Sequence, residues 1–396
     1  MSKKKQSKGY ILLFVIFLII ALTSVFLIFY LQTDPVTEVL KNDQLINVLL
    51  VIEDSGNVLT TQILMYYPVS KRTAMFEIPG NTGAIYASLS RVDRIDAVFK
   101  EKGIKAYSEE IQKLTGVQMP FSIVITKENF CRLSDYLGGL RVFIPSPVEL
   151  QEDGTWYLLP SGSVTLDGDK VADYLTYKLP EEGESLQQER RQTAVLAFLS
   201  ALNSNASSVF TDKNFQEYEK LFSSNVDSKA LKKLLYQISS IDAERLVPQS
   251  VTGSIRSVDG KSLLFPYYDG QLIKDVCKQT MSALVSSSEG AQNRIYVLEI
   301  QNGTAVQGLA KNTAALLQSV GYDVLSMVNA PSNNIDKTYI IDHIGNNDAA
   351  KGIGSFIRCE NIVTEEIDLD ETNLQAASLV DFTIVLGTDF DGRYVR

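Results

Sequence analysis

Residues 75–82 read MFEIPGNT, an apolar strand that ends in a tight turn at Pro79 and Gly80. Residues 63–67 and 73–78 are strand-like, and turn-forming residues separate them at 68–71. This spacing predicts a β-hairpin. The run at residues 45–52 is apolar and β-branched without alternation, as is typical of a strand buried on both faces. We therefore expect the segment around residue 80 to be mounted on a buried sheet.

Strands and helices alternate along the rest of the chain. Residues 121–126 and 140–144 are strand-like and enclose a helical stretch at 127–137, and the strongest helical pattern follows at 187–203. A Ser-rich stretch at 286–291 has the composition of a linker, and new strands and helices begin after it, among them a helix expected at 306–320. Alternation of this kind predicts two α/β domains.

Composition supports two globular domains and disfavours a nucleic-acid partner. A length of 396 residues exceeds one average domain, and 45% hydrophobic with 21% charged residues is ordinary globular composition. The net charge of −10 opposes binding to nucleic acid, which needs a basic face. Because Cys131, Cys277 and Cys359 are widely spaced, neither a disulfide framework nor a zinc knuckle is indicated.

The N-terminus predicts a membrane anchor. Four lysines within residues 3–8 precede an uncharged run from Gly9 to Leu31. About 22 helical residues reach roughly 33 Å, which is enough to cross the hydrocarbon core. Basic residues before the run and acidic residues after it place the N-terminus in the cytoplasm. We expect a single-pass protein of the cytoplasmic (inner) membrane whose later domains are extracytoplasmic or periplasmic; the alternative is a buried core helix.

Several motifs resemble the LytR-CpsA-Psr family of bacterial envelope proteins. The family's first strand ends in an acidic residue, as residues 47–54 do, and its Asp-Ala-Leu-Gly-Gly-Val turn resembles DYLGGL at 135–140. Its Leu-Asn-Gly helix entry resembles LDGDKVADY at 166–174, and the Arg-Gln that ends its last signature resembles Arg191-Gln192. The order and spacing of these pieces carry the resemblance.

The second half of the chain resembles the LytR C-terminal domain, which often follows the first one. The similar residues are VLEIQNGTAVQGLA at 297–310, GYDV at 321–324 and IVLGTDF at 384–390. Together the resemblances imply an α/β, LytR-CpsA-Psr-like domain with a mixed sheet and a smaller α/β LytR C-terminal-type domain. The expected layout is a cytoplasmic tail 1–8, an anchor 9–31, a tether 32–44, the first domain 45–285, a linker 286–293 and the second domain 294–396.

The resemblance also implies a chemistry that this chain has partly lost. Family members move glycopolymers from polyprenyl diphosphate onto the cell wall, which requires cations around two phosphates, a metal held by carboxylates and an apolar slot. The family segment at residues 78–82 usually reads Ile-Pro-Arg-Asp-Thr. Here the positions of the family's acidic and arginine residues are taken by Thr60, Gly80, Asn81, Thr176, Lys178, Ser185 and Gln188.

A few residues remain as candidates for that site. The resemblance implies Arg191 and Lys178 as catalytic residues, Arg191, Gln192, Lys178 and Arg91 as ligands of the lipid phosphate, and Asp54 as a ligand of Mg²⁺ if the phosphate site is functional. Asp54 is equally explained as a turn carboxylate, and Arg191 as the partner of acidic residues in its own helix. Further arginines either rebuild a phosphate site or are solvated surface charge, namely Arg72, Arg91, Arg94 and Arg190.

Three hypotheses about function follow. One phosphate-stabilising arginine is worth roughly three orders of magnitude in rate, so the losses favour a catalytically weakened or inactive scaffold that binds lipid phosphate or glycan in envelope assembly. The alternative is an active glycopolymer phosphotransferase with a rearranged site, and whether the chain is an enzyme stays open. The third, a transcriptional attenuator, is opposed by the anchor and the acidic charge. The expected partners are the membrane and a polyprenyl-phosphate lipid or cell-wall glycan.

Overall fold

The computed structural model describes residues 13–20, 23, 34–42, 44–152, 154–180, 182–286, 296–320, 322–364 and 380–396. Most of the predicted anchor and of the linker at 286–293 therefore lies outside the described residues, although residues 13–20 and 23 are helical. Within the described ranges, no helix combines the length and apolar character needed to cross a membrane.

A mixed six-stranded sheet forms the centre of the first body, in the order β11-β6-β1-β2-β3-β12. β1 (Ile46–Asp54), β2 (Asn57–Tyr67) and β3 (Arg72–Glu77) are antiparallel neighbours, which confirms the predicted hairpin. β6 (Phe121–Thr126) runs parallel to β1, and β11 (Ser223–Ser224) and β12 (Gln249–Ser250) are short edges. The expected mixed sheet is thus present.

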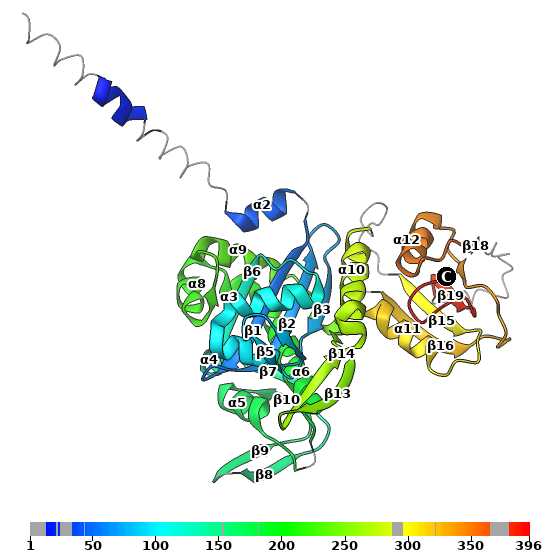
Figure 1. The fold of residues 1–396 in the computed structure, drawn as a ribbon, viewed down its shortest axis with the longest axis horizontal. Coiled ribbons are helices and arrows are strands. Elements are labelled where there is room, and N and C mark those ends of the chain that lie inside the picture. Colours follow the sequence, from blue (N-terminus) through cyan, green and yellow to red (C-terminus); the bar gives the residue numbers. More distant parts are fainter. Residues whose placement is uncertain are drawn as a thin grey trace, which may run out of the picture.

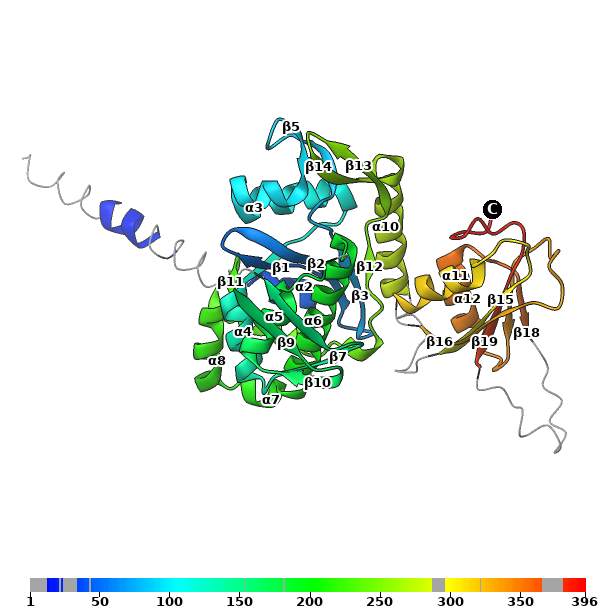
Figure 2. The same cartoon turned by 90° about the horizontal axis from the view of Figure 1, so that it is seen from below.

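Helices cover both faces of this sheet, α3 (Ile95–Thr115) on one and α4 (Lys127–Tyr136), α5 (Gly168–Thr176) and α6 (Glu184–Ser204) on the other (Figure 2). Side chains of β1 alternate between two cores, because successive residues of a strand point to opposite faces. Val48, Leu50 and Ile52 pack with the α4 and α6 side, whereas Leu49 and Val51 pack with the α3 side. The prediction that β1 is buried on both faces is confirmed.

Smaller elements complete the first body. α2 (Pro35–Lys41) packs on α9 (Ser228–Ile238), and the hairpin β8 (Val148–Glu152) with β9 (Thr155–Leu159) projects from the side away from α2 (Figure 1). The other elements are β4 (Gly83–Tyr86), β5 (Arg91–Arg94), β7 (Leu140–Ile144), β10 (Gly162–Leu166), α7 (Ala206–Val209), α8 (Asp212–Tyr218), β13 (Gly253–Val258), β14 (Lys261–Pro266) and α10 (Gln271–Ser286).

The second body is a separate mixed sheet in the order β16-β15-β19-β17-β18, with its own core. Its strands are β15 (Val297–Asn302), β16 (Asp323–Asn329), β17 (Tyr339–Asp342), β18 (Ile362–Thr364) and β19 (Phe382–Leu386), and its helices are α11 (Leu309–Gln318) and α12 (Asn347–Ile357). α11 begins three residues later than the pattern at 306–320 suggests, since Gly308 has a left-handed φ of 74°.

Helix α10 of the first body packs against α12 of the second (Figure 1). The Gln279 side-chain amide donates to the Phe356 carbonyl oxygen at 2.7 Å, and Arg393 donates to the Gln279 side-chain oxygen at 3.0 Å. The guanidinium of Arg72, at the start of β3, lies 4.2 Å from the ring centre of Tyr322. These contacts are specific and polar. Side-chain interactions therefore join the second body to the first, in addition to the connecting chain.

The centre of the first core yields a stability prediction. Phe130 is fully buried and its ring centre lies 5.3 Å from that of Phe198. Phe130→Ala should lower the free energy of unfolding of the first body by about 3–5 kcal/mol, because it leaves a cavity among fixed neighbours. Urea unfolding followed by the fluorescence of Trp156, the single tryptophan, measures this.

Phe143→Ala is the matched control. The Phe143 side chain is 65% exposed on β7, so its removal should change the unfolding free energy by less than about 0.5 kcal/mol. Equal losses in the two variants would contradict the described core.

Candidate functional site

The turn at Gly80 lies directly against the Asp96 side chain. A Cβ atom added at Gly80 would lie 2.7 Å from the Asp96 carboxylate oxygen Oδ2. The backbone amide of Asp96 donates to the carbonyl oxygen of Gly80 at 3.1 Å, so the start of α3 is fastened to this turn. An arginine at position 80 would therefore require Asp96 to move.

Arg94 approaches the same turn from the end of β5, but two carboxylates hold it. Its Nη2 lies 2.7 Å from Asp96 Oδ2, and its Nη1 lies 2.8 Å from Glu184 Oε1 at the start of α6. Burial raises the pKa of Asp96, and the hydrogen bonds from Arg94 oppose this. The sequence marked Arg94 as a possible phosphate ligand and Glu184 only as a possible partner of Arg191, and it gave no sign of Asp96.

Arg191 lies on α6 and connects this helix to α5 and β2. Its Nε donates to the Leu175 carbonyl oxygen in α5 at 3.0 Å, and its Nη1 donates to the Leu59 carbonyl oxygen in β2 at 3.0 Å. Burial and the adjacent Arg190 lower its pKa, whereas nearby glutamates, among them Glu182 and Glu184, act in the opposite direction. The guanidinium thus binds backbone carbonyls, and among the contacts of the described residues it forms no direct ion pair within its own helix.

Arg190 has a structural role. It is buried, donates from Nε to the Tyr174 carbonyl oxygen at 2.9 Å, lies 3.6 Å from the ring centre of Tyr177 and pairs with Glu182. Because all of its groups are engaged, this arginine fixes the loop after α5 and is closed to a ligand.

Glu77 is a member of the cluster that sequence reasoning missed, although it lies within the stretch at 75–82. Its side chain is at the end of β3 and the residue is 5% exposed. Burial raises the pKa of Glu77 to about 7; Arg191 and a hydrogen bond with Ser250 of β12 lower it, and Glu189 raises it further. A carboxyl group is buried here beside an arginine that has no direct bond to it among the described contacts.

The cluster carries more carboxylates than arginines. The carboxylates are Glu77, Asp96, Glu182, Glu184 and Glu189, and the arginines are Arg94, Arg190 and Arg191. Three positive charges against five negative ones leave −2 when all groups are ionised. A site for two phosphates needs the opposite sign.

The remaining predicted site residues differ in exposure and in partners. Lys178 is exposed and Gln192 is half-buried. Arg91 pairs with Asp93 and Glu101, and Arg72 lies at the second body. The structure brings Arg94, Arg190 and Arg191 into one cluster with Glu184, whereas Arg91 and Arg72 have other partners.

Asp54, the predicted metal ligand, is engaged by a lysine. Its Oδ2 lies 2.5 Å from Lys127 Nζ, and Ser55 donates to its other oxygen. Over the described residues, no group of three or more His, Cys, Asp or Glu side chains is placed to hold a metal ion. One carboxylate already paired with an ammonium group does not fit the oxygen-rich shell of Mg²⁺.

Comparison with known sequences finds two matches to family models. The LytR_cpsA_psr family matches residues 41–280. The model described as LytR cell envelope-related transcriptional attenuator matches residues 295–390. No curated protein sequence matches.

Solved structures share the fold of the first body. TagV of B. subtilis aligns with a TM-score of 0.52 and 15% identity over 60% of this chain and 97% of its own. A Streptococcus agalactiae protein, gbs0355, aligns with a TM-score of 0.53 and 14% identity over 63% of this chain and 91% of its own. TagT bound to LI-WTA aligns at a TM-score of 0.46 and 15% identity, over 59% and 88% of the two chains. At these identities the likeness concerns the fold.

Glu77 yields a prediction about pH. Its pKa is about 7 in the folded chain against an ordinary 4.5, so the folded state holds a proton that the unfolded state releases above pH 4.5. The unfolding free energy should therefore fall as pH rises from 4.5 to 7, by about 3 kcal/mol from this group. Glu77→Gln should remove that part of the pH dependence, as measured by urea unfolding at pH 5 and pH 8.

Glu149→Gln on the exposed outer face of β8 serves as the control and should leave the pH dependence unchanged. A Glu77→Gln variant whose stability changes with pH as steeply as that of the parent would contradict the described burial.

Proposed function

Because this chain belongs to the LytR-CpsA-Psr family, we propose that it is an envelope scaffold of that family, anchored in the cytoplasmic membrane, which binds a lipid phosphate or a glycan without transferring it. Both α/β bodies lie outside the cytoplasm in this proposal. The family resemblance supplies the ligand class, a polyprenyl-phosphate lipid or a cell-wall glycan.

The observation that carries the proposal is the neutralisation of Arg94. Its guanidinium binds Asp96, the residue that lies against the Gly80 turn, and Asp96 and Glu184 both contact it at hydrogen-bond distance. A diphosphate would have to displace two carboxylates that are tethered beside their partner. Phosphoryl transfer depends on cations that are already arranged around the phosphates, so this arrangement opposes catalysis.

An active phosphotransferase remains the second candidate, and one observation favours it. Glu184 at the start of α6 is one of the two carboxylates that hold Arg94, so a movement of this helix end would release part of that guanidinium. Exposed Lys178 would add a second cation from the loop between α5 and α6. Mg²⁺ would be needed for such an activity, and Asp54 would first have to leave Lys127.

The experiment measures binding and cleavage of a polyprenyl diphosphate by the purified full-length protein with Mg²⁺. We expect no cleavage. Asp96→Asn with Glu184→Gln keeps the side-chain shapes and frees Arg94, so it should tighten binding by roughly ten-fold or more through the loss of two negative charges. The matched control, Glu101→Gln, removes one of the two carboxylates that pair with Arg91 and should leave binding unchanged.

Two results would overturn the proposal. Cleavage by the parent protein that Arg191→Ala abolishes would establish the transferase. Equal affinity of the parent and the double variant would show that the carboxylates do not neutralise the site.

A further inference from the structure

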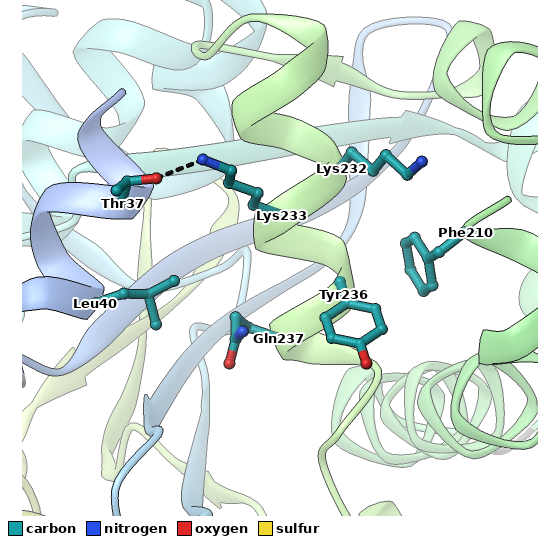
Figure 3. A pocket seen from close by; sticks show the side chains of 7 residues that line it. All are labelled: Thr37, Leu40, Phe210, Lys232, Lys233, Tyr236 and Gln237. Atoms are coloured by element: carbon teal, nitrogen blue, oxygen red, sulfur yellow. Dashed lines mark hydrogen bonds between the residues drawn. The ribbon is translucent and has the colours of Figure 1, made fainter. Parts of the chain in front are cut away.

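A groove on another part of the first body has no role in the proposed function. It encloses about 400 Å³ between α2, α9 and the loop before α8, within the range of about 300–1,000 Å³ that is typical of small-molecule sites (Figure 3). Leu40, Phe210 and Tyr236 form its apolar wall, and Lys232 and Lys233 bring two ammonium groups to it.

Hydrogen bonds and a buried side chain fix α2, which forms one side of this groove. Lys233 Nζ lies 2.6 Å from the Asp34 carboxylate and 2.5 Å from the Thr37 hydroxyl. Burial opposes ionisation of Asp34, but hydrogen bonds from Lys233 and Thr37 lower its pKa to about 2. Val36, on the same helix, is fully buried in the first core. α2 is therefore fixed on α9, and Lys233 is engaged in holding it.

Lys232 is the cation available to a ligand. Its Nζ contacts Asp212 Oδ1 at 2.6 Å, and the Asp212 side chain is 99% exposed. Exposed ion pairs contribute only about 0–1 kcal/mol, so an anionic ligand can replace this partner. In Figure 3 Lys232 lies on the Phe210 side of α9, away from Thr37 and Lys233.

The short distance along the chain between the groove and the predicted anchor indicates which ligand the groove meets. The apolar run ends at Leu31, three residues before Asp34, and three extended residues span only about 10 Å. The groove is therefore held at the bilayer surface if that run is the anchor. Tyr236, 53% exposed, suits this level, because tyrosine combines an apolar ring with a polar tip at membrane interfaces.

This groove is distinct from the cluster at Gly80. α2 precedes the first residue of β1, Ile46, whereas Arg191 binds Leu59, which lies near the other end of that strand. β1 spans about 26 Å at roughly 3.3 Å per residue. The two sites are thus separated by most of the length of the sheet.

We propose that the groove binds an anionic phospholipid of the surrounding bilayer, with its phosphate at Lys232 and the upper part of one acyl chain against Leu40, Phe210 and Tyr236. Such a lipid fixes the orientation of the first body on the membrane. The inference rests on the proposed membrane anchorage.

The test uses the full-length protein in bilayer nanodiscs that contain a phospholipid with a photoreactive acyl chain. An anionic probe should label peptides from residues 34–41 and 228–238, and a zwitterionic probe should label them roughly five-fold less, the effect expected of one lysine near an anionic surface. Lys232→Glu should reduce labelling by the anionic probe at least as much. Lys220→Glu, an exposed lysine also paired with a carboxylate, should not change it.

Other outcomes overturn the inference in distinguishable ways. Labelling that is equal for the two probes, unchanged in Lys232→Glu or confined to residues 9–31 excludes a phospholipid site in the groove while leaving anchorage intact. Extraction of the protein from membranes by alkaline carbonate would instead remove the anchorage on which both this site and the proposed location rest.

Discussion

The double-sided burial of β1 is the constraint on which the rest of the first body depends. The side chains of residues 48–52 point alternately into two hydrophobic cores, one on each face of the sheet. Each face must therefore be covered by helices. Those helices deliver the polar side chains of the site: α3 brings Asp96, and α6 brings Glu184 and Arg191. A shift of one residue in the register of β1 would exchange the two cores and move every one of these helices.

The polar cluster at the edge of this sheet combines an ordered framework with an excess of carboxylates. The backbone of the Gly80 turn, the N-terminus of α5 at Asp167 and the arginines of α6 are fixed by hydrogen bonds. Carboxylates from α3 and α6 occupy the space next to the Arg94 guanidinium. The site is complete as a packed and hydrogen-bonded structure, and its cations are already satisfied.

Sequence patterns predicted the parts of this structure that rest on local periodicity. The hairpin at 63–78, the buried strand at 45–52 and the helix at 187–203 were all identified, because apolar spacing reports directly on burial. The start of α11 was placed wrongly because one left-handed glycine decides it. The family resemblance identified Arg191, but its binding to Leu59 joins residues 132 positions apart, and Arg94 and Glu184 are 90 apart. Contacts at such separations leave no periodic trace in a single sequence.

The closeness of Asp96 to Gly80 couples these two positions. A side chain at position 80 would place its Cβ 2.7 Å from Asp96 Oδ2, so the carboxylate would have to turn away and its bonds to Arg94 would change. Substitutions at positions 80 and 96 should therefore have non-additive effects on stability, because residues that share a contact are energetically coupled.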